Sequence, residues 1–229
     1  MRHAHHTATP SNRRRGIIFD LDGTLADTLD DLTNAVNVVL GRFDRPAVDR
    51  PRVRAIIGHG LRSFLRQASD VEDGTRLDEL VEAYRPVYRA GMLTNTRLYP
   101  GVPTMLDALC DLGLSLAVLS NKPDEFTVPL CAALLSHWRL AAVAGAADEE
   151  HRKPDPRLAL ELAAKMRCRA DDIFFVGDST TDLHTGRNAG MHTVAVTWGY
   201  RDREELLAAR PEAIIDEPRE LLDVVKGVR

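Results

Sequence analysis

The chain has 229 residues, of which 44% are hydrophobic and 28% are charged, and its formal net charge is −4. This composition can fill a sizeable core, which excludes a largely disordered chain, and the slight negative charge gives no indication of nucleic-acid binding. Three widely spaced cysteines without a CxxC pair argue against a disulfide framework or a zinc site. No apolar run approaches membrane-spanning length and the N-terminus lacks a signal-peptide core, so we expect a cytoplasmic protein with no membrane partner.

The chain begins with a polar leader and one short strand. Residues 1–15 include three histidines and the run Arg13-Arg14-Arg15, and we expect them to form a disordered tail. The apolar run Ile17-Ile18-Phe19 follows directly and predicts a buried strand. The sequence therefore places the first core element immediately after the leader.

The next part of the chain, residues 27–97, has a helical pattern and no convincing strand. The helices that the pattern predicts are residues 29–43, 61–67 and 77–88. Pro46 and Pro51 are interpreted as early helix breakers, and Tyr99-Pro100-Gly101 closes the block. A helical block inserted after the first strand of an α/β sheet would lie above the carboxyl end of that strand, where such sheets bind ligands.

Strands and helices alternate over the remainder of the chain. The predicted strands are residues 114–120, 172–176, 191–197 and, more weakly, 213–215. The predicted helices are residues 104–112, 156–166 and 181–188. Gly190 has the place of a helix-stop glycine. This alternation predicts an α/β fold with a parallel sheet that helices cover on both faces.

The segment Asp20-Leu21-Asp22-Gly23-Thr24 follows the first strand and carries the clearest chemical signal. Because side chains alternate along a strand, we expect Asp20 and Asp22 to point the same way. Two neighbouring carboxylates repel each other and stay charged together only with a cation between them. Gly23 and Thr24 supply a turn whose exposed backbone N–H groups suit an anion. A cation and an anion at one strand end suggest phosphate chemistry.

Three further polar clusters come later in the chain. They are Ser120-Asn121, Lys153 within His151–Pro156, and Gly177-Asp178-Ser179-Thr180-Thr181-Asp182. Taken singly, each cluster also fits an ordinary turn, a helix cap or a solvated surface side chain. Together with the first segment they place carboxylates, a hydroxyl, an amide and an ammonium at one sheet edge. Phosphoryl transfer through a carboxylate nucleophile needs such a set, with Mg²⁺ and a proton-shuttling acid.

The order Asp-x-Asp-Gly-Thr, Ser-Asn, Lys-Pro and Gly-Asp-x-x-x-Asp resembles the motifs of haloacid dehalogenase superfamily phosphatases, from Gly16 to about Val225. Within that superfamily the chain looks most like bacterial phosphoglycolate phosphatases. Segments that carry this finer likeness include Leu25-Ala26-Asp27-Thr28, Gly58-His59-Gly60 and Gly186-Arg187-Asn188-Ala189-Gly190-Met191. The resemblance implies a Rossmann-like α/β core of residues 16–26 and 98–229. It also implies a small all-helical cap of residues 27–97, inserted after the first strand.

The resemblance also implies roles for the matching positions. Asp20 would be the nucleophile that becomes aspartyl-phosphate, and Asp22 would protonate the leaving alcohol and then activate water. Lys153 would be the third catalytic residue, and Asp182 would hold the metal's waters or orient Lys153. The residues that would bind Mg²⁺ are Asp20, Asp22 through its backbone carbonyl, Asp178 and Asp182. The residues that would bind the phosphoryl group are Gly23, Thr24, Ser120, Asn121 and Lys153.

The expected substrate loop in the cap is Gly58-His59-Gly60. Two glycines let the backbone approach a ligand, and the imidazole of His59 could meet a small carboxylate. An ordinary turn between helices with an exposed histidine is the alternative. The expected reaction is Mg²⁺-dependent hydrolysis of 2-phosphoglycolate to glycolate and phosphate. The expected partner is thus a small phosphorylated metabolite, and the protein would be a monomer or a homodimer.

Other functions remain open at this point. The core motifs fit a phosphatase for pyrophosphate, a sugar phosphate or a nucleoside monophosphate equally well. A phosphomutase would keep the same nucleophile but would need cap residues that hold a sugar, and no clear set is present. Asp22 disfavours halide chemistry, because the dehalogenase branch has no aspartate there. A non-catalytic scaffold is disfavoured because it has no need for several like-charged carboxylates.

Overall fold

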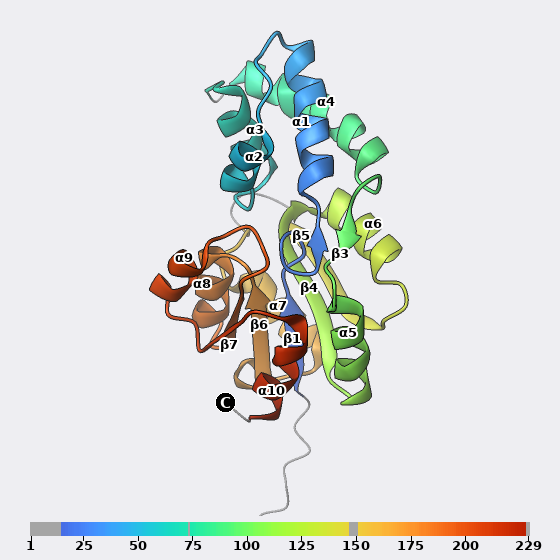
Figure 1. Cartoon of the computed structure of the whole chain (residues 1–229), viewed down its shortest axis with the longest axis vertical. Helices are drawn as coiled ribbons and strands as arrows, with labels where there is room; N and C mark the ends of the chain where they lie inside the picture. Colours follow the sequence, from blue (N-terminus) through green and yellow to red (C-terminus); the bar gives the residue numbers. More distant parts are fainter. Residues whose placement is uncertain (1–14, 73, 147–150, 228–229) are drawn as a thin grey trace, which may run out of the picture.

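The computed structural model describes residues 15–72, 74–146 and 151–227. Its central feature is a sheet in the order β5-β4-β1-β6-β7-β8, in which every neighbouring pair of strands is parallel (Figure 1). The strands are β1 (Gly16–Phe19), β4 (Ser115–Pro123), β5 (Leu140–Ala146), β6 (Ile173–Gly177), β7 (His192–Val196) and β8 (Ala213–Ile215). The predicted α/β fold with a parallel sheet is therefore confirmed.

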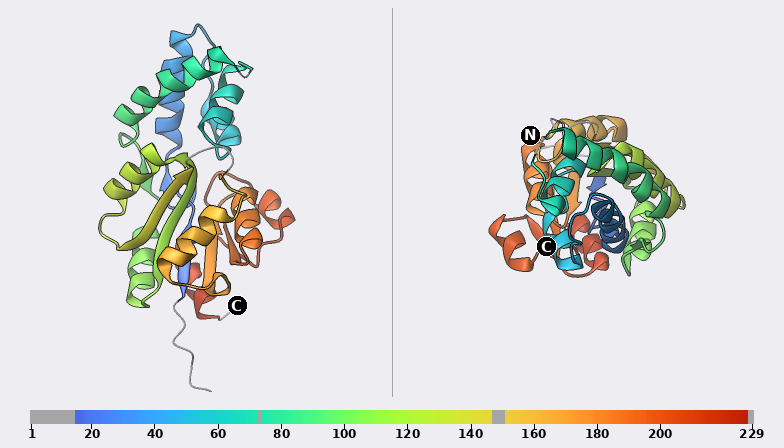
Figure 2. Two further views of the ribbon diagram at one scale, coloured as in Figure 1. Left: turned by 180° about the vertical axis from the view of Figure 1, so that it is seen from behind. Right: turned by 90° about the horizontal axis from the view of Figure 1, so that it is seen from above.

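Helices cover both faces of this sheet (Figure 2). On one face Ile18 of β1 packs in a cluster with α7 (Arg157–Met166), and on the other Ile17 and Phe19 belong to the larger core cluster. Neighbouring strand residues point to opposite faces, so an apolar run such as β1 is buried on both sides. The other helices around the sheet are α5 (Val102–Asp111), α6 (Asp124–Leu134), α8 (Thr180–Asn188), α9 (Arg203–Ala208) and α10 (Leu221–Lys226). Two short 3-10 turns, Ala170–Asp172 and Pro218–Glu220, complete the chain around the sheet.

Four elements of this layer were missing from the sequence prediction, namely β5, α6 and the two six-residue helices α9 and α10. The edge strand β5 reads Leu-Ala-Ala-Val-Ala-Gly-Ala, and alanine and glycine are weak strand formers. Helix α6 contains Pro129, which argues against a helix when only the sequence is considered. In addition, β4 runs three residues beyond the predicted end, through Pro123, so that Ser120 and Asn121 lie inside the strand. Tertiary contacts thus override weak local propensity in β5 and α6.

A helical block lies above the carboxyl edge of the sheet (Figure 1). Its helices are α1 (Leu29–Arg42), α2 (Arg50–Ile56), α3 (Leu61–Ser69) and α4 (Thr75–Gly91). Pro51 was expected to break a helix, but it lies in the first turn of α2, where a missing N–H costs nothing. The expected absence of strands is also wrong, because β2 (Ala26–Asp27) pairs antiparallel with β3 (Arg97–Leu98) where the chain enters and leaves the block. Two-residue strands are too short to leave a periodic pattern.

The expected N-terminal tail lies outside the described residues, except for Arg15. The carbonyl of Arg15 accepts a hydrogen bond from the N–H of Ser115 at 3.1 Å, and its guanidinium lies 5.4 Å from the centre of the Phe174 ring. Arg15 is therefore part of the core layer. None of the helices in the described ranges combines the length and the apolar surface that a bilayer crossing requires.

Asp31 joins α1 to the segment that returns from the helical block to the sheet. Its carboxylate accepts hydrogen bonds from the backbone N–H groups of Asn95 and Thr96, at 2.9–3.0 Å, and from both of their side chains at 2.8 Å. Burial opposes the charge of Asp31, but these hydrogen bonds outweigh it and lower the pKa of the carboxyl. The charged carboxylate is therefore the form that joins α1 to the returning segment at Asn95 and Thr96.

Replacing Asp31 with asparagine should lower the free energy of unfolding by about 1–3 kcal/mol at neutral pH, since an amide N–H would face the donors of Asn95 and Thr96. The folded pKa lies below the ordinary value of 3.8, so the stabilisation is present above 3.8 and is lost as the pH falls through the folded pKa. Urea denaturation of both proteins along a falling pH series measures this. A difference between the two proteins that stays constant below pH 3.8 would contradict it.

Candidate active site

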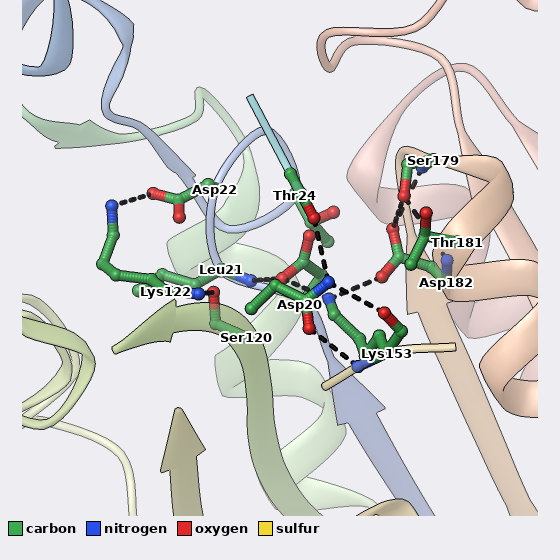
Figure 3. Close-up of polar contacts among 12 residues, drawn as sticks. Asp20, Leu21, Asp22, Thr24, Ser120, Lys122, Lys153, Ser179, Thr181 and Asp182 are labelled. Carbon is green, nitrogen blue, oxygen red and sulfur yellow. Dashed lines mark hydrogen bonds and ion pairs between the residues drawn. The ribbon is translucent and has the colours of Figure 1, made fainter. Parts of the chain in front are cut away.

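The carboxyl edge of the sheet brings together residues that are far apart in the sequence (Figure 3). Asp20 follows β1, Ser120 and Asn121 lie in β4, Asp178 follows β6, and Lys153 lies in the segment before α7. All five side chains belong to buried residues. Strands β4, β1 and β6 are parallel neighbours, so their carboxyl ends meet at one place. The site that the sequence predicted at this edge is therefore assembled by strand order.

Lys153 holds two of the carboxylates. Its Nζ lies 2.8 Å from Asp20 Oδ1 and 2.7 Å from Asp182 Oδ1. Burial opposes the charge of Lys153, but the carboxylates of Asp182 and Asp20 outweigh burial and raise its pKa, so the amine stays protonated. The other oxygen of Asp182 accepts from the N–H of Ser179 at 3.0 Å, at the beginning of α8. Asp182 was expected either to hold the metal's waters or to orient Lys153, and these contacts fit the second role.

Three carboxylates in this site lie close enough to share a cation. Asp20, Asp178 and Asp182 each offer an oxygen, and these oxygens lie within 4.8 Å of one another. Burial, followed by the charge of Asp182, raises the pKa of both Asp20 and Asp178. One ammonium, that of Lys153, does not balance three buried negative charges. A hard divalent cation with oxygen ligands, such as Mg²⁺, fits this donor set.

Two glycines allow the chain to close around Asp178. Gly23 has a φ of +86°, and a Cβ there would lie 2.4 Å from Asp178 Oδ2. A Cβ at Gly199 would lie 2.3 Å from Asp178 Cβ and 2.4 Å from the carbonyl oxygen of Gly23. Asp178 also accepts hydrogen bonds from Thr24 Oγ1 at 3.2 Å and from the N–H of Tyr200 at 2.7 Å. Thr24 thus contacts the carboxylate of Asp178. Gly199 and Tyr200 also contact Asp178, and no sequence motif indicated these two residues.

Asp20 and Asp22 do not point the same way, which corrects the sequence-based expectation (Figure 3). Asp22 Oδ1 lies 2.9 Å from Lys122 Nζ and accepts a hydrogen bond from Thr28 Oγ1 at 2.6 Å. Strand β1 ends at Phe19, so the alternation of side chains in a strand does not extend to the two aspartates. Each of them instead has its own lysine. Asp22 also lies outside the three-carboxylate cluster, so its side chain is not part of the expected metal site.

Lys122 is the main residue of this region that the sequence analysis did not assign to a site. Its side chain is 5% exposed, and its Nζ also donates to the hydroxyl of Tyr88 at 2.9 Å. The available signal was its spacing from Ser120, because residues two apart in a strand share a face. A buried lysine that contacts α4 of the helical block connects the two parts of the molecule at the site.

The candidate substrate loop is held by side chains from the sheet side of the molecule. Three consecutive loop carbonyls each accept a hydrogen bond. The carbonyl of Ile57 accepts from Arg201 at 2.7 Å, and that of Gly58 accepts from Asn121 Nδ2 at 2.9 Å. The carbonyl of His59 accepts from Arg152 at 2.8 Å. Asn121 also bonds to both the N–H and the carbonyl of Lys153, at 2.7 and 3.0 Å. The Asn121 side chain therefore links the loop to Lys153, a contact that the expected phosphoryl-binding role of Asn121 did not include.

The structure gives His59 a different position from the expected one. Gly58 and Gly60 line the cavity at the site, with φ values of +106° and +84°, but His59 is exposed and does not line it. Although His59 is exposed by surface area, partial desolvation by neighbouring atoms, followed by the cations Arg201 and Arg152, lowers its pKa, which favours the neutral form. A neutral imidazole that does not line the cavity is poorly suited to bind a substrate carboxylate. The loop glycines, and not the histidine, reach the cavity.

The cavity between the sheet edge and the helical block has a volume of about 60 Å³. Its floor includes Asp20, Lys153 and Asp178, and its upper wall is aromatic. The aromatic residues on that wall are Phe64, Tyr84, Tyr88 and Phe126. The acidic cluster therefore opens into a small space that the helical block covers.

A parallel α/β sheet with buried carboxylates and a lysine at its carboxyl edge, covered by a helical block, is an α/β enzyme architecture whose site is suited to phosphoryl transfer. The family model described as haloacid dehalogenase-like hydrolase matches residues 17–196. The chain therefore belongs to the haloacid dehalogenase-like hydrolases, and it is a phosphatase of that family that hydrolyses phosphoric monoesters.

Several bacterial proteins with similar sequences are named as phosphatases. The chain is 33% identical over 213 residues to phosphoglycolate phosphatase 1 of Pseudomonas aeruginosa, covering 91% of this chain and 78% of the relative. It is 31% identical over 215 residues to N-acetylmuramic acid 6-phosphate phosphatase of the same organism, covering 93% and 95%. The crystal structure of a predicted phosphoglycolate phosphatase from Haemophilus somnus superposes with a TM-score of 0.84 at 28% identity, covering 92% and 97%. The relatives thus agree on phosphatase activity and differ in substrate.

Proposed function

We propose that this protein is a cytoplasmic, Mg²⁺-dependent phosphatase that hydrolyses 2-phosphoglycolate to glycolate and phosphate. The observation that carries the proposal is the buried carboxylate of Asp20, which Lys153 holds at 2.8 Å on the floor of a small covered cavity. A carboxylate in this position can act as a nucleophile toward phosphorus. The lysine beside it can bind the phosphoryl oxygens that carry negative charge.

The contacts of Asp20 indicate which of its atoms would attack. Oδ1 is bound by Lys153 and by the N–H of Leu21, at 2.8 and 2.7 Å, which leaves Oδ2 for the bond to phosphorus. As this bond forms, the bond from phosphorus to the glycolate oxygen would break, and Asp22 would give that oxygen a proton. Asp22 would then accept a proton from water as the water attacks phosphorus. Phosphate leaves, and Asp20 is regenerated.

The remaining site residues would bind and orient. Mg²⁺ would be held by Asp20, Asp178 and the backbone carbonyl of Asp22. Asp182 would orient Lys153 through their ion pair. When bound, Mg²⁺ would neutralise the carboxylates and the charge on the transferred phosphoryl group. Ser120, Lys153 and the backbone N–H of Asn121 would bind phosphoryl oxygens. The covered cavity would exclude bulk water from the reacting atoms.

The volume of the cavity supports a small substrate. At about 60 Å³ the cavity has room for roughly four to six waters, which is enough for a two-carbon acid. The relative named for N-acetylmuramic acid 6-phosphate makes that larger ester the second candidate. Pyrophosphate is also small enough to fit, so it belongs in the substrate screen.

A phosphate-release screen tests the assignment. With Mg²⁺ present, kcat/KM for 2-phosphoglycolate should exceed the value for each other phosphate by about 10-fold or more. The panel should contain N-acetylmuramic acid 6-phosphate, glucose 6-phosphate, a nucleoside monophosphate and pyrophosphate. EDTA should remove the activity and added Mg²⁺ should restore it. A higher kcat/KM for any other member, or isomerised sugar phosphate in place of free phosphate, would contradict the proposal.

A further inference from the structure

The aromatic wall of the cavity carries hydrogen-bond donors that have no acceptor among the described residues. The hydroxyl of Tyr84 is buried and has no hydrogen-bond partner, and Tyr84 is 1% exposed. The hydroxyl of Tyr88 accepts a hydrogen bond from Lys122 Nζ, so its own hydrogen remains available. Lys122 Nζ donates to Tyr88 and to Asp22, which uses two of its three hydrogens. Three donors of this wall are thus available to a ligand.

These donors are fixed in place by packing. The rings of Tyr84 and Tyr88 stack with centroids 5.4 Å apart, one turn apart on α4. Phe64 packs edge-on against Tyr84 at 6.0 Å, and Phe126 packs edge-on against Tyr88 at 5.1 Å. Rings packed on both sides cannot rotate away to find water, and a buried hydroxyl without a partner costs free energy. Burial also raises the pKa of both tyrosines, so both keep their hydrogens.

The position of Lys122 relates this wall to the reaction. Lys122 Nζ lies 2.9 Å from Asp22, the residue that would protonate the leaving oxygen. Tyr84, Tyr88 and Lys122 line the same cavity as Asp20. A group that meets these donors would therefore belong to the leaving alcohol and lie only a few atoms from its oxygen.

We propose that Tyr84, Tyr88 and Lys122 form a subsite that binds the carboxylate of a small phosphorylated carboxylic acid and determines the choice of substrate. The inference rests on the proposed function, because it assigns the leaving-group end of that substrate. Carboxylate oxygens only accept hydrogen bonds, which matches a wall whose available groups are donors. A sugar hydroxyl would bring a donor with each acceptor. The subsite takes the place of the exposed His59, which the sequence had indicated for the carboxylate.

Removal of one hydroxyl from the stacked pair is the direct test. In Tyr84→Phe the ring and its packing remain, and only the unpartnered donor is lost. We expect kcat/KM for 2-phosphoglycolate to fall about 10-fold or more, mainly through KM. For ethyl phosphate, which has the same ester bond and no carboxylate, kcat/KM should change less than about twofold. Equal losses on the two substrates, or no loss on either, would overturn the subsite.

Binding of compounds that cannot be hydrolysed gives a second readout. By calorimetry, Tyr84→Phe should weaken 3-phosphonopropionate about 10-fold and leave propylphosphonate, which lacks the carboxylate, unchanged. If the wild type hydrolyses phosphoglycolate and ethyl phosphate equally well, the subsite is wrong and the phosphatase function stands. If it hydrolyses neither but binds 3-phosphonopropionate in a Tyr84-dependent manner, the proposed function is wrong and the subsite stands.

Discussion

Replacing Asp20 with asparagine is expected to abolish phosphate release, with a loss of about 10⁴-fold or more in kcat for 2-phosphoglycolate. The amide of asparagine is too weak a nucleophile to form the phospho-enzyme. Its shape is nearly unchanged, and it can still accept the hydrogen bonds of Lys153 and the Leu21 N–H. Steady-state phosphate release measures the loss. Acid-quenched trapping of labelled phosphate on the protein should show label on the wild type and none on the variant.

The stability of the Asp20 variant separates chemistry from folding. Burial and neighbouring carboxylates raise the pKa of Asp20, so its negative charge destabilises the metal-free folded state. Asp20→Asn should therefore unfold at the same denaturant concentration as the wild type, or at a higher one. Asp44→Asn is the matched control, because Asp44 is exposed with a φ of +54° that asparagine also adopts, and it should keep full activity. Retained turnover in Asp20→Asn would refute the nucleophile assignment.

Lys153→Met is expected to lose both activity and stability. Its ammonium is the cation that lies between Asp20 and Asp182, at 2.8 and 2.7 Å. Without it the phosphoryl group loses one charged partner, and kcat should fall by about 10²–10³-fold. The two carboxylates are left unpaired, so metal-free protein should lose about 3 kcal/mol of unfolding free energy at neutral pH. The folded pKa of Lys153 is raised above the ordinary 10.5, so its stabilisation is fully present below that pH.

A double variant distinguishes the two effects of Lys153. Lys153→Met combined with Asp182→Asn removes one of the unpaired carboxylates, so much of the stability should return while the activity stays low. Exposed Lys165→Met is the control for loss of a lysine and should match the wild type in both measurements. Urea denaturation and phosphate release on the four proteins give the comparison. Restored activity in the double variant would show that Lys153 acts only by holding Asp182.

The strand end at Asp20 illustrates what a local pattern predicts well. The apolar run before it and the glycine after it are local properties, and both the strand and the positive φ at Gly23 are present in the structure. Strand β5 and helix α6 were missed because their alanines and Pro129 are poor local signals. These elements form because neighbouring strands and helices bury them. Burial by distant parts of the chain is not visible in a short window of sequence.

The candidate site divides in the same way. The identities of Asp20, Lys153 and Asp178 follow from motifs, since their chemistry is intrinsic to the side chains. That Lys122 pairs with Asp22, and that Asn121 ties Lys153 to the Gly58 loop, depends on contacts between residues that are 32 or more positions apart in the sequence.

The sequence alone thus predicted the parallel α/β class and the polar residues that gather at the candidate site, because strand patterns and functional groups are local features of the chain. Only the tertiary structure decided that Asp20 and Asp22 each pair with a different lysine, that His59 does not line the cavity, and that the Tyr84 hydroxyl is buried without a partner. The physical reason is that direction, burial and hydrogen-bond pairing depend on how the helical block packs over the sheet. No single segment of the sequence contains that packing.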